Sequence, residues 1–347
     1  MEGCRRVIDR FLLSLSRSPM KEACAEFLGT FFLILCGDGV MAAITLGRLD
    51  HAATLVSAFG WGLAILIGIC IAGGISGGHL NPAVTVAMAC MRKCPWKCVF
   101  PYILSQYLAS FIAAALVYTV YYDAINEFDN GIRQMPPDVN STAQIFSTYP
   151  QAYVSIGACF IDQVVGTALL LIVICAATDK RSTNLPHIQS AVIGLGLAAI
   201  CLAFGQNCGA PLNPARDLGP RIFTALAGWG LKTFSVRNWR WFWIPVIGPH
   251  VGAVLGVWLY HFFIEMHYRN YELLFNGREL ERTEEQLPTV CITKPSSVSS
   301  NERMLSSDGT EVFKISYKNS EKETSNEVPQ KEEAPQKTSE DPASLLL

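Results

Sequence analysis

The sequence predicts an all-α membrane protein in which six transmembrane helices and two re-entrant half-helices form inverted repeats. Three observations predict this fold. Half of the 347 residues are apolar and only 16% are charged, whereas soluble domains carry about a quarter charged residues. Six stretches are apolar over the length of about 20 residues that a helix needs to span a bilayer. The third observation is an internal duplication of the chain.

The six predicted spans are separated by polar or glycine-rich segments. They are residues 22–46, 55–75, 99–122, 157–177, 188–208 and 242–264. Four of them contain no Asp, Glu, Lys or Arg. After about Tyr268 the composition shifts to Ser, Glu, Lys and Pro with few aromatic residues, which favours disorder. We therefore expect a short N-terminal segment at 1–20, a membrane domain at 21–268 and a disordered tail at 277–347.

Basic residues in short loops predict the orientation, because Lys and Arg resist translocation. Several precede the first, third and fifth spans, whereas the long loop at 123–156 contains only Arg133. We therefore expect both termini in the cytosol. The same loop carries the sequon Asn140-Ser141-Thr142, which can be used only on the lumenal side. Asn140 is a glycosylation candidate, with a chance sequon as the alternative.

The internal duplication relates two halves of the chain, at about 21–122 and 157–264. Residues 25–30 in the first span match residues 162–167 in the fourth. An Asn-Pro-Ala tripeptide also follows the second span of each half. The odd number of spans per half inverts the second half, so the two tripeptides should approach each other from opposite faces. They are Asn81-Pro82-Ala83 and Asn213-Pro214-Ala215.

Each tripeptide precedes an apolar run too short to cross a bilayer, at 83–91 and, after a polar first turn, at 222–229. We expect two half-helices that enter the membrane and stop. Asn is a preferred N-cap, and Pro fits at the first helical position because its missing N–H is not needed there. Irregular backbone at membrane depth is tolerated only where it is buried in protein or lines a watery path. The pattern therefore predicts a path through the middle of the membrane.

With these paired motifs the chain resembles the aquaporin family over roughly residues 20–268, and within it the glycerol-conducting branch, the aquaglyceroporins. The resemblance implies a passive, plasma-membrane channel for water, glycerol and similar small uncharged solutes, with urea a further candidate. It implies a homotetramer in the lipid bilayer, with no catalysis, cofactor, metal or nucleic acid. The positive half-helix ends and the amides of Asn81 and Asn213 would exclude ions and protons, as in aquaporin-type pores generally.

The resemblance also assigns a selectivity filter. Arg216 stands where the first half has Val84, and in the family this arginine donates hydrogen bonds to solute hydroxyls. Spacing from the motifs carries over the other positions as Trp61, Cys201 and Ala210. Water-selective members usually have His at the position of Cys201, so a small side chain there favours a wider, less polar pore. The alternatives are a Trp61 that only packs and an Arg216 that only pairs with a carboxylate.

Two further residues near the filter have expected roles. Asp217 accompanies the glycerol-conducting branch in the family, although an acidic residue in a first helical turn is also favoured by the helix dipole. Cys208 lies five residues before Asn213, so we expect it to make the pore sensitive to mercurials. The other cysteines lie mostly within spans or on the cytosolic side, which predicts reduced thiols.

Glu26 is the acidic residue of the first span that needs an explanation, because an intramembrane carboxylate is a functional candidate. One interpretation is proton coupling. The other is support of the re-entrant loop, with Glu26 accepting hydrogen bonds from backbone N–H groups or from His79. Gln163 at the duplicated position favours support, since an amide does not titrate. Nothing in the sequence assigns Asp38 or Asp162 to the pore.

The main alternative function is a secondary transporter of a small polyol, because inverted repeats and broken helices also build transporter sites. A transporter would need coupling carboxylates at mid-depth, and apart from Glu26 none is convincingly placed. An enzyme is disfavoured, because the sequence shows no phosphate loop, paired acids or nucleophile constellation.

Overall fold

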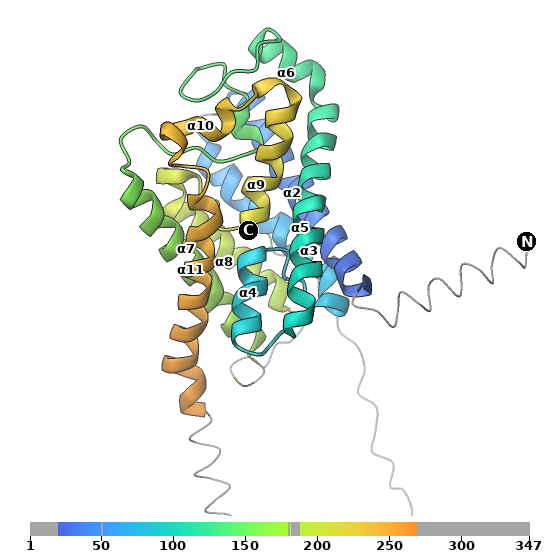
Figure 1. The fold of residues 1–347 in the computed structure, drawn as a ribbon, viewed down its shortest axis with the longest axis vertical. Helices are drawn as coiled ribbons and strands as arrows, with labels where there is room; N and C mark the ends of the chain where they lie inside the picture. Colours follow the sequence, from blue (N-terminus) through green and yellow to red (C-terminus); the bar gives the residue numbers. More distant parts are fainter. Residues whose placement is uncertain (1–19, 50, 180, 182–187, 269–347) are drawn as a thin grey trace, which may run out of the picture. The chain divides into compact units, whose positions relative to one another are not determined.

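The computed structural model describes residues 20–49, 51–179, 181 and 188–268. Every regular element in this part of the chain is a helix. Six helices are long and apolar enough to cross a membrane, which confirms the predicted fold class. They are α2 (Met20–Leu46), α3 (Ala53–Ser76), α5 (Trp96–Val120), α7 (Ile156–Thr178), α8 (Gln189–Cys208) and α11 (Ile244–Tyr260), whose span continues to Tyr268; all six labels appear in Figure 1.

Two short helices begin at the Asn-Pro-Ala motifs, as predicted. They are α4 (Pro82–Cys90) and α9 (Pro214–Thr224). Figure 1 shows α9 in the upper part of the helical bundle and α4 in the lower part. The remaining elements are α6 (Tyr122–Asp129), η1 (Ala143–Ile145), η3 (Ala225–Trp229), α10 (Lys232–Trp239) and η4 (His261–Glu265).

The inverted repeat appears in the neighbours of the two half-helices. Helix α4 of the first half packs mainly against α11, the last span of the second half. Helix α9 of the second half packs mainly against α5, the last span of the first half. The two half-helices also contact each other. Each half-helix is therefore held by the opposite half of the chain.

Glycines bring the long helices into close contact where the two halves meet. Helices α3 and α8 pack together, with Gly62 of α3 facing Gly194 of α8. A Cβ atom built on Gly62 would lie only 2.6 Å from the carbonyl oxygen of Gly194. Small residues at such crossings let helix backbones approach closely, which is a principal source of helix association in membranes.

Most predicted helix boundaries differ slightly from the structure, and two of the differences are informative. Helix α5 begins at Trp96 rather than residue 99, because Pro95 has extended backbone angles and ends the preceding turn there. The last span begins at Ile244 rather than residue 242 and continues through η4 to Tyr268. The second half-helix includes the predicted polar first turn, whose charged side chains Arg216 and Asp217 are buried within the protein and do not face lipid.

The chain divides into two units, residues 1–286 and 287–347. The second unit lies outside the described residues. The predicted tail at 277–347 does too, as does the N-terminal segment apart from Met20. The site described below belongs to the first unit.

Candidate functional site

The two Asn-Pro-Ala motifs cap their half-helices with the same local geometry. Asn81 Oδ1 accepts a hydrogen bond of 2.8 Å from Ala83 N, and Asn213 Oδ1 accepts one of 3.0 Å from Ala215 N. Pro82 and Pro214 follow as the first helical residues, where a missing N–H costs nothing. Both asparagines are therefore fixed in orientation by the start of their own helix.

The same two asparagines also join the halves of the chain. Asn81 Nδ2 donates to the carbonyl oxygen of Leu212 at 2.9 Å, and Asn213 Nδ2 donates to that of Leu80 at 2.7 Å. The interaction is reciprocal, since each amide reaches the residue that precedes the other motif. Each Nδ2 carries two hydrogens, so one N–H of each amide remains for a molecule in the adjacent cavity, which both asparagines line.

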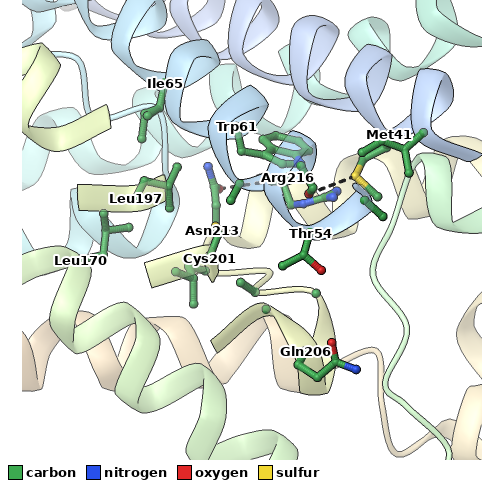
Figure 2. A pocket seen from close by; sticks show the side chains of 18 of the residues that line it. Met41, Thr54, Trp61, Ile65, Leu170, Leu197, Cys201, Gln206, Asn213 and Arg216 are labelled. Carbon is green, nitrogen blue, oxygen red and sulfur yellow. Dashed lines mark hydrogen bonds between the residues drawn. The ribbon is translucent and has the colours of Figure 1, made fainter. Parts of the chain in front are cut away.

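A cavity of about 300 Å³ lies on one side of this junction and is lined by both halves of the chain. All four expected filter residues border it, namely Trp61, Cys201, Ala210 and Arg216. Much of the remaining wall is apolar, with Ile65, Leu170 and Leu197 grouped together in Figure 2. The cavity thus combines a largely apolar wall with a few polar groups, a composition typical of small-molecule sites.

Arg216 is held in place by three elements. Its Nη1 donates to the carbonyl oxygen of Phe146 at 2.8 Å. Its Cζ lies 4.3 Å from the centroid of the Trp61 ring, a cation–π distance, and Figure 2 shows the two side chains against each other. Asp38 Oδ1 lies 3.7 Å from the same Nη1. No other hydrogen bond occupies the guanidinium among the described residues, so its remaining N–H groups are open to the cavity it lines.

Trp61 forms one edge of an amphipathic surface of the cavity. Its ring packs against Gly37 of α2, where a side chain would collide with it. Only 8% of the residue is exposed. Gly37 thus makes room for the ring beside Arg216, and the two side chains present an apolar edge and a row of donors side by side.

Asp217 does not line the cavity, in contrast to its neighbour Arg216. It is fully buried and accepts hydrogen bonds from the backbone N–H and the hydroxyl of Thr148. It also forms a buried ion pair of 2.7 Å with Arg221, whose guanidinium donates to the carbonyl oxygens of Thr148 and Thr233. Asp217 therefore anchors the connection between α6 and α7, the segment that supplies the Phe146 carbonyl to Arg216.

Tyr149 packs against the anchor formed by Asp217, Arg221 and Thr148. Arg221 lies over its ring, with Cζ 4.8 Å from the centroid. Burial raises the pKa of Tyr149 to about 12, although the Arg221 charge opposes this. The phenol is therefore neutral at physiological pH, and the only charges in the anchor are those of the Asp217–Arg221 pair.

The Glu26 side chain supports the first re-entrant loop by binding the main chain of that loop. Its carboxylate accepts hydrogen bonds from His79 N at 2.9 Å and from Leu80 N at 2.7 Å. Two side chains, Ser76 and Gln106, donate to it as well. The His79 ring instead lies 3.2 Å from the hydroxyl of Thr85. Of the two expected sources of hydrogen bonds to Glu26, the structure therefore has the backbone and not the imidazole.

Gln163 does not repeat this arrangement, although it occupies the duplicated position. Its amide donates to Asp162 Oδ2 at 2.9 Å. Its carbonyl oxygen has no hydrogen-bond partner among the described residues. The last turn of α8, just before the second loop, is instead held by a hydrogen bond from Gln151 N to Asn207 O. Among the described residues, Gln163 thus makes no hydrogen bond to the second loop that would support it as expected.

The cysteine expected to react with mercurials is placed away from the cavity. Cys208 is fully buried against Cys159 and Trp241. Cys201, about two helical turns earlier in α8, is partly exposed and lines the cavity. Helix α8 therefore presents Cys201, and not Cys208, to the cavity.

Sequence reasoning missed two contributors to the site. The Phe146 carbonyl could not be found, because a backbone acceptor in a long connection has no residue signature. Asp38 was left unassigned, although its buried carboxylate in a span was a signal of function.

The comparisons with known proteins agree on one family. The family model described as "Major intrinsic protein" matches residues 14–260. Aquaporin-9 of Homo sapiens is 42% identical over 270 residues, covering 78% of this chain and 91% of that protein. Aquaporin-10 of Milnesium tardigradum is 46% identical over 260 residues, covering 72% of this chain and 64% of that longer protein.

A solved structure is similar over the same region. It is described as the X-ray structure of the aquaglyceroporin from Plasmodium falciparum, and it matches with a TM-score of 0.63 and 31% sequence identity. The match covers 71% of this chain and 97% of that one.

Proposed function

Since this chain belongs to the major intrinsic protein family, we propose that it is a passive membrane channel for water, glycerol and similar small uncharged solutes. The observation that carries the proposal is the cavity that brings Arg216, Trp61, Cys201 and Ala210 together beside the two Asn-Pro-Ala motifs. One wall of this cavity can donate hydrogen bonds while the rest is largely apolar. A polyol has the complementary pattern, with hydroxyls along one edge and carbons along the other.

Passage of water and glycerol relies on the donors that remain open. The free N–H groups of Arg216 would bind solute hydroxyls in the filter. The second N–H groups of Asn81 and Asn213 would bind an oxygen atom at the junction. Cys201 leaves room opposite them, because its side chain is far smaller than a histidine ring. Urea, which offers one acceptor oxygen and a flat shape, is a further candidate solute.

Exclusion of ions and protons follows from the paired half-helices. Each helix N-terminus carries a positive partial charge of roughly half an elementary charge. Helices α4 and α9 meet at their N-termini, so a cation at the junction faces both partial charges. The asparagines donate hydrogen bonds to any water there, which interrupts a proton wire.

The transporter alternative loses its main candidate for proton coupling. Each oxygen of the Glu26 carboxylate accepts two hydrogen bonds from fixed donors of the loop and its neighbours. A carboxylate that holds the main chain in this way is suited to structural support. The Asn81–Leu212 and Asn213–Leu80 bonds also favour a fixed pore, since alternating access would break the contact between the halves.

The finer assignments rest on the sequence and the family. We propose that residues 21–268 are the channel domain, that both termini face the cytosol, and that the chain forms homotetramers in the plasma membrane. The basic residues of the described connection between α4 and α5 support this orientation. A non-catalytic role fits a site built of donors and apolar walls.

The sequon lies in the connection that would face the exterior. Asn140 is half-buried, and the Thr142 hydroxyl of the sequon donates to Asp129 Oδ2 at 2.9 Å. Glycosylation of Asn140 would therefore have to occur before this connection folds. A shift in electrophoretic mobility on glycosidase treatment, absent in Asn140→Gln, tests it.

The channel is tested by reconstitution into liposomes and shrinkage in sucrose, glycerol and urea. We expect fast, unsaturable water and glycerol fluxes with low activation energy. Trp61→Phe should alter the glycerol-to-water ratio while water flux persists. Saturable flux with steep temperature dependence would instead indicate a transporter, and water flux without glycerol flux would refute the glycerol assignment.

A further inference from the structure

Asp38 is a buried acid with no hydrogen-bond partner for either carboxylate oxygen among the described residues. It lies in the span α2 and is 0% exposed. Burial of a carboxylate is strongly unfavourable unless a partner compensates its charge. An ionised Asp38 therefore requires a nearby cation, and a neighbouring element supplies one.

The cation that faces Asp38 is the filter arginine. Asp38 Oδ1 lies 3.7 Å from Arg216 Nη1, and the two side chains are 0% and 7% exposed. This separation is an ion pair just beyond hydrogen-bond distance. The Nη1 hydrogen bond goes to Phe146, so Asp38 contributes charge without taking up a donor. Arg216 lines the cavity and Asp38 does not, which places the carboxylate behind the guanidinium as seen by a solute.

Neither Asp38 nor Arg216 has a charged counterpart at the matching position of the other repeat. The offset that relates Asn81 to Asn213 relates Val84 to Arg216, and the offset that relates Glu26 to Gln163 relates Asp38 to Cys175. Each half thus has an apolar residue where the other half has a charge. These two unmatched charges, one on α2 and one on α9, lie next to each other in the structure. Two charges that both break the duplication and lie side by side fit a joint role at the filter.

We propose that Asp38 is the counter-charge of Arg216 and a specificity-determining residue of the pore, so that the filter is a buried ion pair and not a bare cation. This inference rests on the proposed function, since it concerns the same filter. A neutral pair keeps the N–H donors that a polyol needs while removing most of the net positive field. Removal of one member then exposes the charge of the other to the cavity.

The test is a charge cycle in proteoliposomes, with ion leaks driven by an imposed potential. The variants are Arg216→Val, Asp38→Asn and the double variant. Arg216→Val leaves Asp38 unpaired. We expect the proton and potassium leak of this variant to rise about tenfold over wild type, because the uncompensated negative charge then attracts cations into the cavity. The double variant should lose most of that increase. Asp38→Asn alone should instead raise the nitrate leak, because Arg216 is then unpaired.

Two controls separate charge from folding. Asp162→Asn removes another buried intramembrane carboxylate, whose hydrogen-bond partners are Gln163 and Asn207, and should leave all leaks at the wild-type level. Asp38→Cys installs the residue that the second half accommodates at the duplicated position. If Asp38→Asn does not fold, the nitrate leak is measured in Asp38→Cys instead.

Equal cation leaks in Arg216→Val and in the double variant would overturn the counter-charge role. Water and glycerol fluxes of the wild type are measured in the same vesicles. Their absence would refute the channel itself, whereas normal fluxes together with equal leaks would refute only the role of Asp38.

Discussion

The carboxylate of Asp217 and the guanidinium of Arg221 form a fully buried ion pair of 2.7 Å one helical turn apart in α9. The pair fixes the Thr148 backbone from both sides, through its N–H and its carbonyl oxygen. A residue next to Arg216 in sequence thus contributes to the position of that guanidinium indirectly, by holding the connection that carries Phe146.

Loss of one member of this pair should destabilise the protein. Arg221→Met leaves Asp217 as an uncompensated buried charge, which costs about 3–5 kcal/mol. We expect a markedly lower midpoint of thermal unfolding in detergent. Asp123→Asn, which removes an exposed acid of α6, is the matched control and should change the midpoint little. An Arg221→Met protein as stable as wild type would contradict the anchoring role.

Gly62→Ala should weaken the contact between α3 and α8. The new methyl group would lie 2.6 Å from the Gly194 carbonyl oxygen, and such overpacking costs about 1–3 kcal/mol. Gly74→Ala in the same helix is the control, because no atom lies within 4 Å of its Cβ position and alanine is the better helix former. The unfolding midpoints of the two variants in the same detergent should move in opposite directions.

Glu26→Gln should reduce conduction without revealing proton coupling. Both carboxylate oxygens accept hydrogen bonds, so an amide nitrogen in place of one oxygen would face donors, at a cost of about 1–3 kcal/mol for each unsatisfied group. We expect lower water and glycerol flux per folded channel. The measurement is vesicle shrinkage with and without a pH gradient. Glycerol uptake that follows the gradient in wild type and loses this dependence in the variant would favour the transporter.

Mercurial block should depend on Cys201. Its thiol borders the cavity, whereas Cys208 is fully buried outside it. We expect Cys201→Ser to abolish most of the inhibition of water flux by mercuric chloride, while Cys208→Ser stays as sensitive as wild type. The reverse pattern would show that the path passes Cys208.

Local rules were enough to predict the half-helices. An Asn N-cap followed by Pro specifies where a helix begins, and the structure has that geometry at Asn81 and Asn213. The fold class followed from span number and the inverted duplication. Spacing from the motifs also identified residues that the structure brings to one cavity, because Trp61 and Cys201 lie on helices that run directly into the motif loops.

The remaining details depend on rotation and on backbone contacts that composition does not encode. Helix α2 is apolar around most of its circumference, so its sequence does not indicate which side Asp38 faces. Gln163 occupies the position of Glu26 but donates its amide N–H to its neighbour Asp162, which a carboxylate, having no donor, could not do. The duplication therefore predicts topology better than it predicts hydrogen bonds.

The reciprocal bonds of Asn81 and Asn213 have a consequence for biosynthesis. The ribosome delivers the first motif long before the second, and until α9 arrives the Asn81 amide and the Leu80 carbonyl lack their partners. In a bilayer such groups must be satisfied within the protein or by water. Until the second half is inserted, the Asn81 amide and the Leu80 carbonyl therefore require water or other temporary partners, and the first loop gains its final hydrogen bonds only when α9 arrives.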